Sequence, residues 1–254
     1  MSIKKAIIDL NHGFYIQKSS LSGGAYPYVV NYLLVGGGAG ATSVNDTNDP
    51  YYYAGGDGGA VVQATLPFYA GNTYTITVGY GGNGGGLPGN NTNNSTQIAG
   101  SGQPSQIKLG ASVLATASGG NPNSLGISYG GSGAAGAGGT GGAPVANTRG
   151  GNGRNGLTSS ITGSSVYYAG GGAGIVNLQV PPYYASGTAG QGSYGAGATA
   201  IYVGSVQQPG GNNGVVILSI PTSSYSGKTT GSPTITTSGS NTILTYTGSG
   251  TYIS

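Results

Sequence analysis

Glycine recurs at every third position in the middle of this chain. Two series show the spacing: Gly130, Gly133, Gly136, Gly139 and Gly142, and, after a break, Gly150, Gly153 and Gly156. Three residues per turn is the period of the left-handed polyproline-II-type helix, which makes no hydrogen bonds within itself. Its amides and carbonyls must therefore find partners on neighbouring segments or in water. Where such helices pack side by side, a Cβ would hold the backbones apart, so these glycines are predicted to be structural.

The residues between the glycines decide which packed structure fits. Collagen obeys the same steric logic, but its intervening positions are rich in proline. Here they are Ser, Ala, Thr, Asn and Arg, which favours a bundle of polyglycine-II helices cross-linked by backbone hydrogen bonds. The alternative is that the glycine-rich stretches are flexible linkers. Six alternations with strand-like and aromatic segments argue for the bundle.

Strand signals stand out against the glycine background. Runs rich in β-branched and aromatic residues, bounded by glycine or proline, predict strands within 26–38, 60–66, 73–79 and 214–221, and a hairpin in 232–254. No segment has helical periodicity. The expected fold is all-β and irregular, with short antiparallel, sandwich-like strands, a packed polyglycine-II bundle and essentially no α-helix. Three regions are predicted: a docking segment with the first strand (1–34), a glycine-rich body with protruding Tyr/Ser/Asn loops (35–220) and a Thr/Ser-rich hairpin (221–254).

Few residues could support catalysis. His12 is the only histidine, the acids are four aspartates, and there is no cysteine. The G-x-G-x-x-G pattern occurs at 79–84 and 131–136, among other places in this glycine-rich chain, but neither of these stretches opens a helix, which a dinucleotide site requires. We expect no enzymatic activity and no cofactor. One alternative is a calcium site, because Asp46, Asp49 and Asp57 supply the hard oxygen ligands that calcium takes; turn formation explains the same residues.

Charge and hydropathy restrict the partners. Only 4% of the residues are charged, against about 25% in an average domain. The net charge of +3 is spread along the chain, whereas nucleic-acid binding needs a clustered basic footprint. No apolar window approaches the roughly 20 residues of a membrane span, and the apolar run after Lys5 is too short for a signal peptide. We expect neither nucleic-acid binding nor membrane insertion.

Tyrosine is the one abundant side chain suited to recognition. The chain has 20 tyrosines, and several stand in runs: Tyr51, Tyr52 and Tyr53; Tyr167 and Tyr168; Tyr183 and Tyr184. Tyrosine combines a large apolar ring with a polar group, and binding loops favour it together with Ser, Gly and Asn. These seven residues are the candidate receptor-binding set. The alternative is that the rings pack internally as a substitute core, and members of one run can differ.

Three stretches carry a family resemblance. "YLLVGGGAG" (32–40), "AVVQATLPFYAGNTYTITVGYGGNGG" (60–85) and "GGNNGVVILSIP" (210–221) resemble the glycine-rich domain of tailed-bacteriophage virion proteins. The plan is also similar to that of the tail-fibre tip adhesins of T-even-like phages, in which a polyglycine-II bundle presents aromatic loops to a host receptor. The resemblance implies a virion tail protein, made in the host cytoplasm without a signal peptide.

The expected function is adhesion without catalysis. The resemblance implies contacts with other tail or fibre proteins and with a host glycan or outer-membrane protein, and a homo-oligomer is expected. The alternative is a purely structural fibre, tail or capsid-decoration subunit. Ice binding is a third possibility, since some antifreeze proteins are polyglycine-II bundles, but those require a flat Ala/Thr face.

Overall fold

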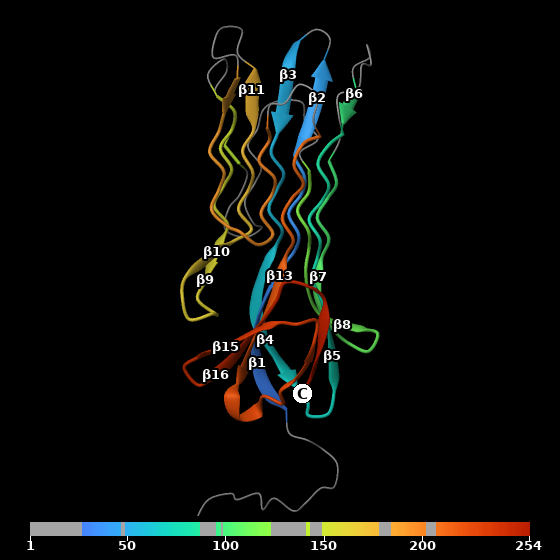
Figure 1. Ribbon diagram of the computed structural model, residues 1–254, viewed down its shortest axis with the longest axis vertical. Coiled ribbons are helices and arrows are strands. Elements are labelled where there is room, and N and C mark those ends of the chain that lie inside the picture. The colour runs from blue at the N-terminus through green and yellow to red at the C-terminus, as the bar shows by residue number, and fades with distance from the viewer. Residues whose placement is uncertain are drawn as a thin grey trace, which may run out of the picture.

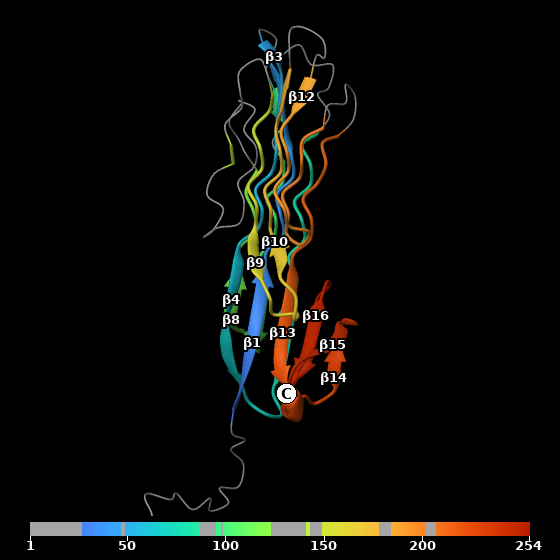
Figure 2. The same cartoon turned by 90° about the vertical axis from the view of Figure 1, so that its left-hand side faces the viewer.

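From β1 to β13, each strand adjoins a glycine-rich segment at one of its ends, so strands and bundle segments alternate along this part of the chain. The computed structural model describes residues 27–46, 49–86, 95–97, 99–122, 141–142, 149–177, 184–201 and 207–254. A two-sheet sandwich forms one end, here called the base, the glycine-rich bundle forms the middle, and a small sheet forms the distal end (Figures 1 and 2). The chain enters the described part at the base and passes repeatedly between the two ends.

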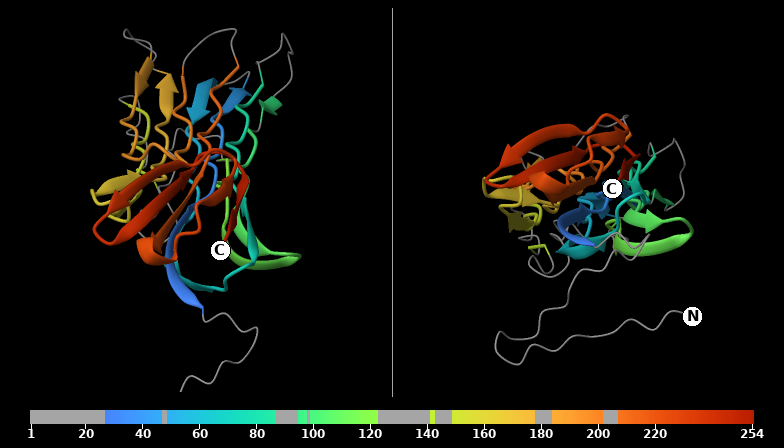
Figure 3. Two further views of the ribbon diagram at one scale, coloured as in Figure 1. Left: turned by 60° about the horizontal axis from the view of Figure 1, so that its bottom comes forward. Right: turned by 90° about the horizontal axis from the view of Figure 1, so that it is seen from below.

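The base consists of two antiparallel five-stranded sheets. The first, in order across the sheet, is β15 (Thr234–Ser238), β16 (Asn241–Tyr246), β13 (Val215–Pro221), β1 (Tyr28–Val35) and β4 (Val61–Phe68). The second is β14 (Lys228–Thr230), β17 (Gly250–Ile253), β5 (Thr73–Thr77), β7 (Ser105–Leu109) and β8 (Ser112–Ala117). The β15–β16 and β7–β8 hairpins project from opposite sides of the base (Figures 1 and 3).

The remaining strands belong to the distal sheet and to one hairpin. The distal sheet has the order β12 (Tyr184–Ser186), β11 (Ile175–Asn177), β3 (Asp49–Ala54), β2 (Thr42–Asp46) and β6 (Ser95–Gln97). The hairpin pairs β9 (Leu157–Ser159) with β10 (Val166–Tyr168) where the bundle meets the base. The only helical turn in the described residues is a 3-10 turn, η1 (Thr222–Ser224).

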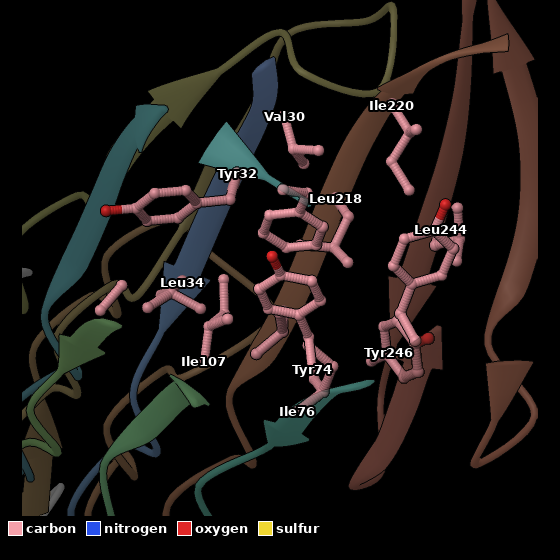
Figure 4. Packing of buried hydrophobic residues seen from close by; sticks show 14 of the residues in the cluster. Val30, Tyr32, Leu34, Tyr74, Ile76, Ile107, Leu218, Ile220, Leu244 and Tyr246 are labelled. Carbon is pink, nitrogen blue, oxygen red and sulfur yellow. The ribbon is translucent and has the colours of Figure 1, made fainter. Parts of the chain in front are cut away.

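The main core lies between the two sheets of the base (Figure 4). Alternate residues of the central strands point into it, among them Val30, Tyr32 and Leu34 of β1. Aromatic rings fill much of its volume, and the rings of Phe68 and Tyr74 stack with centroids 3.7 Å apart. Tyrosine thus replaces the missing tryptophan as the large core side chain.

The β9–β10 hairpin covers the outer face of the first sheet. Leu33 of β1 and Ile217 of β13 are buried on this face, in a cluster with Tyr168. A hydrogen bond of 2.8 Å from Ser159 Oγ to Gln63 Oε1 joins the hairpin to the edge strand β4. β1 and β13 are therefore covered on both faces, which explains the apolar run at 215–218 that opens β13.

The bundle is held by backbone hydrogen bonds that repeat every three residues. Residues 36–41 form its central segment, and their amides donate in rotation to three neighbours over 2.9 to 3.1 Å: Gly36 to Ala60, Gly37 to Gln103, Gly38 to Asn212, Ala39 to Asp57, Gly40 to Gly100 and Ala41 to Pro209. Three other segments donate to its carbonyls, through the amides of Gly82, Gly85, Gly120 and Ala198. The central segment thus has hydrogen-bonded neighbours on six sides, as a polyglycine-II lattice requires.

The second glycine series lies at bundle contacts. A Cβ on Gly150, Gly153 or Gly156 would meet the carbonyl oxygen of Gly174, Gly171 or Tyr168, respectively, well inside the 3.0 Å that real Cβ contacts respect. The residue numbers of these partners fall by three for each rise of three in the glycine numbers. Two antiparallel helices of the same three-residue period are therefore in contact. At Gly142 the nearest atom would be 3.4 Å away, which is ordinary contact. Gly130, Gly133, Gly136 and Gly139 lie outside the described residues.

The predicted fold class is confirmed: the described chain is all-β, antiparallel and nearly without helix. The finer organisation differs from the expectation. The body is expected to carry protruding Tyr/Ser/Asn loops, but its Tyr/Ser/Asn-rich stretches 42–54, 157–169 and 175–186 contain β2 and β3, β9 and β10, and β11 and β12. These stretches are rich in Thr, Val and Tyr, which favour strands. The bundle holds them side by side, so they can pair where the glycine-rich segments end. The predicted boundaries at 34 and 220 fall inside β1 and β13, and strands from all three predicted regions share the first sheet.

Candidate functional site

The distal sheet is fastened to the bundle by a small apolar cluster. Tyr53 of β3 is 2% exposed and packs with Ala41, Ile175, Ala198 and Ala200. Most of these partners are alanines that end glycine-rich segments, so their methyl groups leave room for one aromatic ring. Tyr53 therefore anchors the distal sheet, and its ring lies inside the protein.

A buried glutamine clamps another segment at the same end. Gln208 is 3% exposed, and its side-chain amide forms two hydrogen bonds with the backbone of Ile201. Ile201 N–H donates to Oε1 over 3.0 Å, and Nε2 donates to the Ile201 carbonyl over 2.9 Å. The side chain takes the place of a neighbouring strand for Ile201, so the two segments are held in register as they reach the distal end.

Besides the buried Tyr53, three of the candidate tyrosines lie in the distal sheet. Tyr51 and Tyr52 are in β3, and Tyr52 is paired with Val44 of β2. Tyr184 begins β12 and is paired with Asn177 of β11. β12 is two strands away from β3, about 10 Å across the sheet. The structure thus gathers residues from two separate tyrosine runs at one end of the molecule, and Tyr183 lies outside the described residues.

Tyr167 and Tyr168 do not join this group. Both are in β10, at the junction of bundle and base (Figure 2). Tyr168 is 2% exposed, its ring stacks near Tyr194, and burial raises its pKa. Tyr167 is 40% exposed, on the opposite face of the same short strand. The packing interpretation therefore applies to Tyr53 and Tyr168, and β10, which carries Tyr167, lies at the opposite end of the bundle from the distal sheet.

The three candidate calcium ligands are divided. Asp46 and Asp49 are paired across the β2–β3 hairpin at its distal end. Asp57 lies eight residues beyond Asp49, along a strand and then a bundle segment, which is roughly 25 Å of extended chain. Within the side chains that the structure describes, no group of three or more His, Cys, Asp or Glu residues could hold a metal ion. A site that uses all three aspartates is not formed.

Two residues of the bundle segments have roles that the sequence patterns did not indicate. Tyr80 is 63% exposed at the base of a bundle segment, while Gln208 is a buried polar anchor. Neither belongs to a tyrosine run or occupies a defining position of a motif, and their roles depend on which segments lie beside them. Among the residues that can be described, no helix has the length and apolarity needed to span a membrane.

Comparison with known proteins gives one result. The family model described as a glycine-rich domain matches residues 20–252. No curated protein shows significant sequence similarity to the chain. The matched region includes every described strand of the base, the bundle and the distal sheet except for the last residue of β17. The chain therefore belongs to the glycine-rich domain family.

Proposed function

We propose that this protein is a non-enzymatic virion component of a tailed bacteriophage and acts as an adhesin at the tip of a tail or tail fibre. Its ligand is a host surface glycan or outer-membrane protein. The distal end forms the receptor-binding surface, with Tyr51, Tyr52, Tyr183 and Tyr184 as its aromatic contacts. The base carries the attachment to other tail or fibre proteins and to sister chains.

One observation carries this proposal: the bundle is a cross-linked shaft that brings separate chain segments to one end. Strands β2, β3, β6, β11 and β12 meet there, opposite the end where the described chain begins (Figures 1 and 2). A scaffold whose backbone hydrogen bonds are satisfied between segments holds its end segments in fixed relative positions. Binding residues are commonly displayed in this way, on connections held by a rigid scaffold.

The chemistry of this end suits an uncharged ligand surface. Charged residues make up 4% of the chain, so ion pairs contribute little to any interface. Tyrosine with serine, asparagine and glycine offers ring stacking and neutral hydrogen bonds at a low cost in side-chain entropy. Adhesion through these contacts should depend only weakly on salt concentration.

The test is binding of the labelled protein to a panel of bacterial strains. A Tyr51→Ser/Tyr52→Ser/Tyr184→Ser variant leaves the anchor Tyr53 intact. Tyr80→Ser is the matched control, because it removes an exposed ring from the shaft. All three proteins must share the same circular dichroism spectrum and thermal midpoint. Selective binding that the triple variant loses and Tyr80→Ser keeps supports the proposal, whereas equal loss in both variants contradicts a distal site.

A purely structural virion subunit is the second candidate. Val113 and Leu114, on the edge strand β8, are 49% and 36% exposed, and the hairpin that carries them projects from the base (Figure 3). An uncharged, apolar edge strand is suited to pairing with another chain. This candidate predicts self-association that is lost in Val113→Ser/Leu114→Ser, together with no binding to any strain of a panel that contains the phage host.

A further inference from the structure

The chain contains four Asn-Gly dipeptides, and all of them lie in bundle segments: Asn83-Gly84, Asn152-Gly153, Asn155-Gly156 and Asn213-Gly214. Asn-Gly is the dipeptide most prone to deamidation, because glycine offers its backbone nitrogen with little steric hindrance. In three of the four, both the asparagine side chain and the following amide are hydrogen-bonded to a neighbouring segment; in the fourth, neither group has a partner among the described residues. We propose that Asn83 is the site of spontaneous deamidation and isoaspartate formation in the folded protein.

Asn152 and Asn155 are held by two hydrogen bonds each. Asn152 Oδ1 accepts from the Thr188 amide over 2.9 Å, and the Gly153 amide donates to the Thr188 carbonyl over 2.8 Å. One turn later, Asn155 and Gly156 bond in the same way to Gln191, both over 2.9 Å. Each asparagine side chain and the following amide therefore clamp one residue of the neighbouring segment, and the clamps repeat with the bundle period.

Asn213 is held in a related way. Its Oδ1 accepts from the Gly81 amide over 2.9 Å, and the Gly214 amide donates to the Gly79 carbonyl over 2.8 Å. Both reacting groups of this dipeptide are therefore also bound to a neighbouring segment. Three of the four sites share the same protection.

Asn83 lacks both of these bonds. Within the part of the chain that the structure describes, its side chain and the Gly84 amide have no hydrogen-bond partner. The bonds at this dipeptide involve the two carbonyl oxygens, which accept from the Gly100 amide and from Gln207 Nε2. Accessibility alone does not separate the sites, since Asn155 and Asn213 are exposed as well. Hydrogen bonding is the feature that singles out Asn83.

The reaction needs only water. The Gly84 backbone nitrogen attacks the Asn83 side-chain carbonyl carbon, a C–N bond forms, and the side-chain amide leaves as ammonia with the amide proton. Water then opens the resulting succinimide at either carbonyl, which yields aspartate or isoaspartate. At the three clamped sites two hydrogen bonds must break before the attack; at Asn83 neither has to.

The product would disturb the bundle at a defined place. The Gly82 and Gly85 amides, on either side, both donate over 2.8 Å to the central segment, at Gly38 and Ala41. Isoaspartate at position 83 adds one backbone carbon between these two bonds, so the three-residue spacing no longer matches. Aspartate would add a carboxylate to a chain that has only four acidic residues.

The experiment follows the four sites in the folded full-length protein. The protein is incubated in mildly alkaline buffer and digested with trypsin, and each asparagine is located by fragment-ion sequencing. Cleavage after Arg149 and Arg154 separates Asn152 from the others. An isoaspartyl methyltransferase assay measures the isoaspartate formed, and Asn83→Ser should remove most of that signal.

Two lost hydrogen bonds correspond to a rate ratio on the order of tenfold or more. Asn83 should therefore react at least about tenfold faster than each clamped site, and the four rates should converge when the protein is unfolded in denaturant. The proposal is overturned if a clamped site reacts as fast as Asn83 in the folded protein. It is also overturned if the preference persists in the unfolded chain, because local sequence would then be the cause.

A second variant tests the clamp itself. Thr188→Pro removes the amide that bonds Asn152 Oδ1, and proline suits a polyproline-II-type segment. Asn152 should then deamidate several times faster, while Asn155, clamped by Gln191, keeps its rate. An unchanged rate at Asn152 in a folded Thr188→Pro protein would overturn the protective role of the clamp.

Discussion

At the scale of single residues, glycine acts in this protein by lacking a side chain. At Gly153 the position that a Cβ would occupy is taken by the backbone carbonyl of Gly171. A backbone carbonyl in a bonded segment cannot rotate away as a flexible side chain can. The cost of adding a methyl group is therefore set by the neighbouring segment.

We expect Gly153→Ala to lower the free energy of unfolding by about 3 kcal/mol, the upper part of the usual range for overpacking. Gly142→Ala is the matched control from the same glycine pattern, and there the nearest atom leaves 3.4 Å. It should change stability by less than about 0.5 kcal/mol. Urea unfolding followed by circular dichroism measures both, and equal effects would contradict the role of contact in setting the glycine period.

Tyr246 links stability to pH. It is fully buried, its Oη donates to the Thr251 carbonyl over 3.0 Å, and burial raises its pKa above the usual value. The unfolded chain loses this proton near pH 10, while the folded chain keeps it to higher pH. The stabilising contribution is therefore complete below about pH 10 and falls as the pH rises further.

Tyr246→Phe should cost about 1 kcal/mol at neutral pH through the lost hydrogen bond. It should also weaken the decline in stability above about pH 10. Chemical unfolding at several pH values measures both effects, with the exposed ring variant Tyr80→Phe as the control. A decline in Tyr246→Phe as steep as that of the wild type would show that other groups control alkaline unfolding.

At the scale of elements, the C-terminal strands complete the base. β16 pairs with β13, and β17 lies between β14 and β5 in the second sheet. Tyr252 of β17 is fully buried, and its hydroxyl lies 3.0 Å from that of Tyr28. The chain end therefore belongs to the same folded unit as β1.

Tyr252→Ala should destabilise the whole base by about 3 to 5 kcal/mol, the range for large aromatic truncations in a core. Ile235→Ala, on the edge strand β15, removes an apolar side chain that is 49% exposed and should cost less than about 1 kcal/mol. Thermal unfolding followed at two wavelengths checks both variants. A Tyr252→Ala protein with wild-type stability would mean that the C-terminal strands are dispensable.

At the scale of the whole molecule, stability is distributed between a conventional core and a hydrogen-bonded bundle. The central segment 36–41 has no side chain larger than alanine, yet its residues are buried and bonded to neighbours on six sides. Opening it requires the separation of several surrounding segments at once. Such a segment exchanges its amides only through large opening events.

Hydrogen exchange should therefore find the amides of 36–41 as protected as those of β1 and β13. Glycine-rich sequence alone would predict fast exchange. The edge strand β8 supplies the fast-exchanging reference within the same molecule, since most of its residues are exposed. Exchange measured by mass spectrometry would contradict the bundle if 36–41 exchanged as quickly as β8.

Local patterns made much of the fold predictable. The three-residue glycine period indicates close helix packing, as at Gly150, Gly153 and Gly156, and β-branched runs indicate strands, because both depend on neighbouring residues in the chain. The tyrosines could not be assigned in this way. Tyr167 and Tyr168 are adjacent and chemically identical, but one is exposed and the other is buried. Successive side chains of β10 point to opposite faces, so Tyr168 packs against the first sheet while Tyr167 faces solvent.

The sequence by itself determined that this chain is an all-β, helix-poor protein built around a glycine lattice, since only glycine permits backbones to approach so closely. Tertiary structure decided which segments are neighbours in that lattice, which tyrosines are buried and which of the four Asn-Gly side chains has no hydrogen-bond partner among the described residues. Tyr53 anchors the distal sheet because Ala41, Ala198 and Ala200, distant in sequence, converge around it. Such convergence depends on the order in which segments cross the bundle, and no local pattern encodes that order.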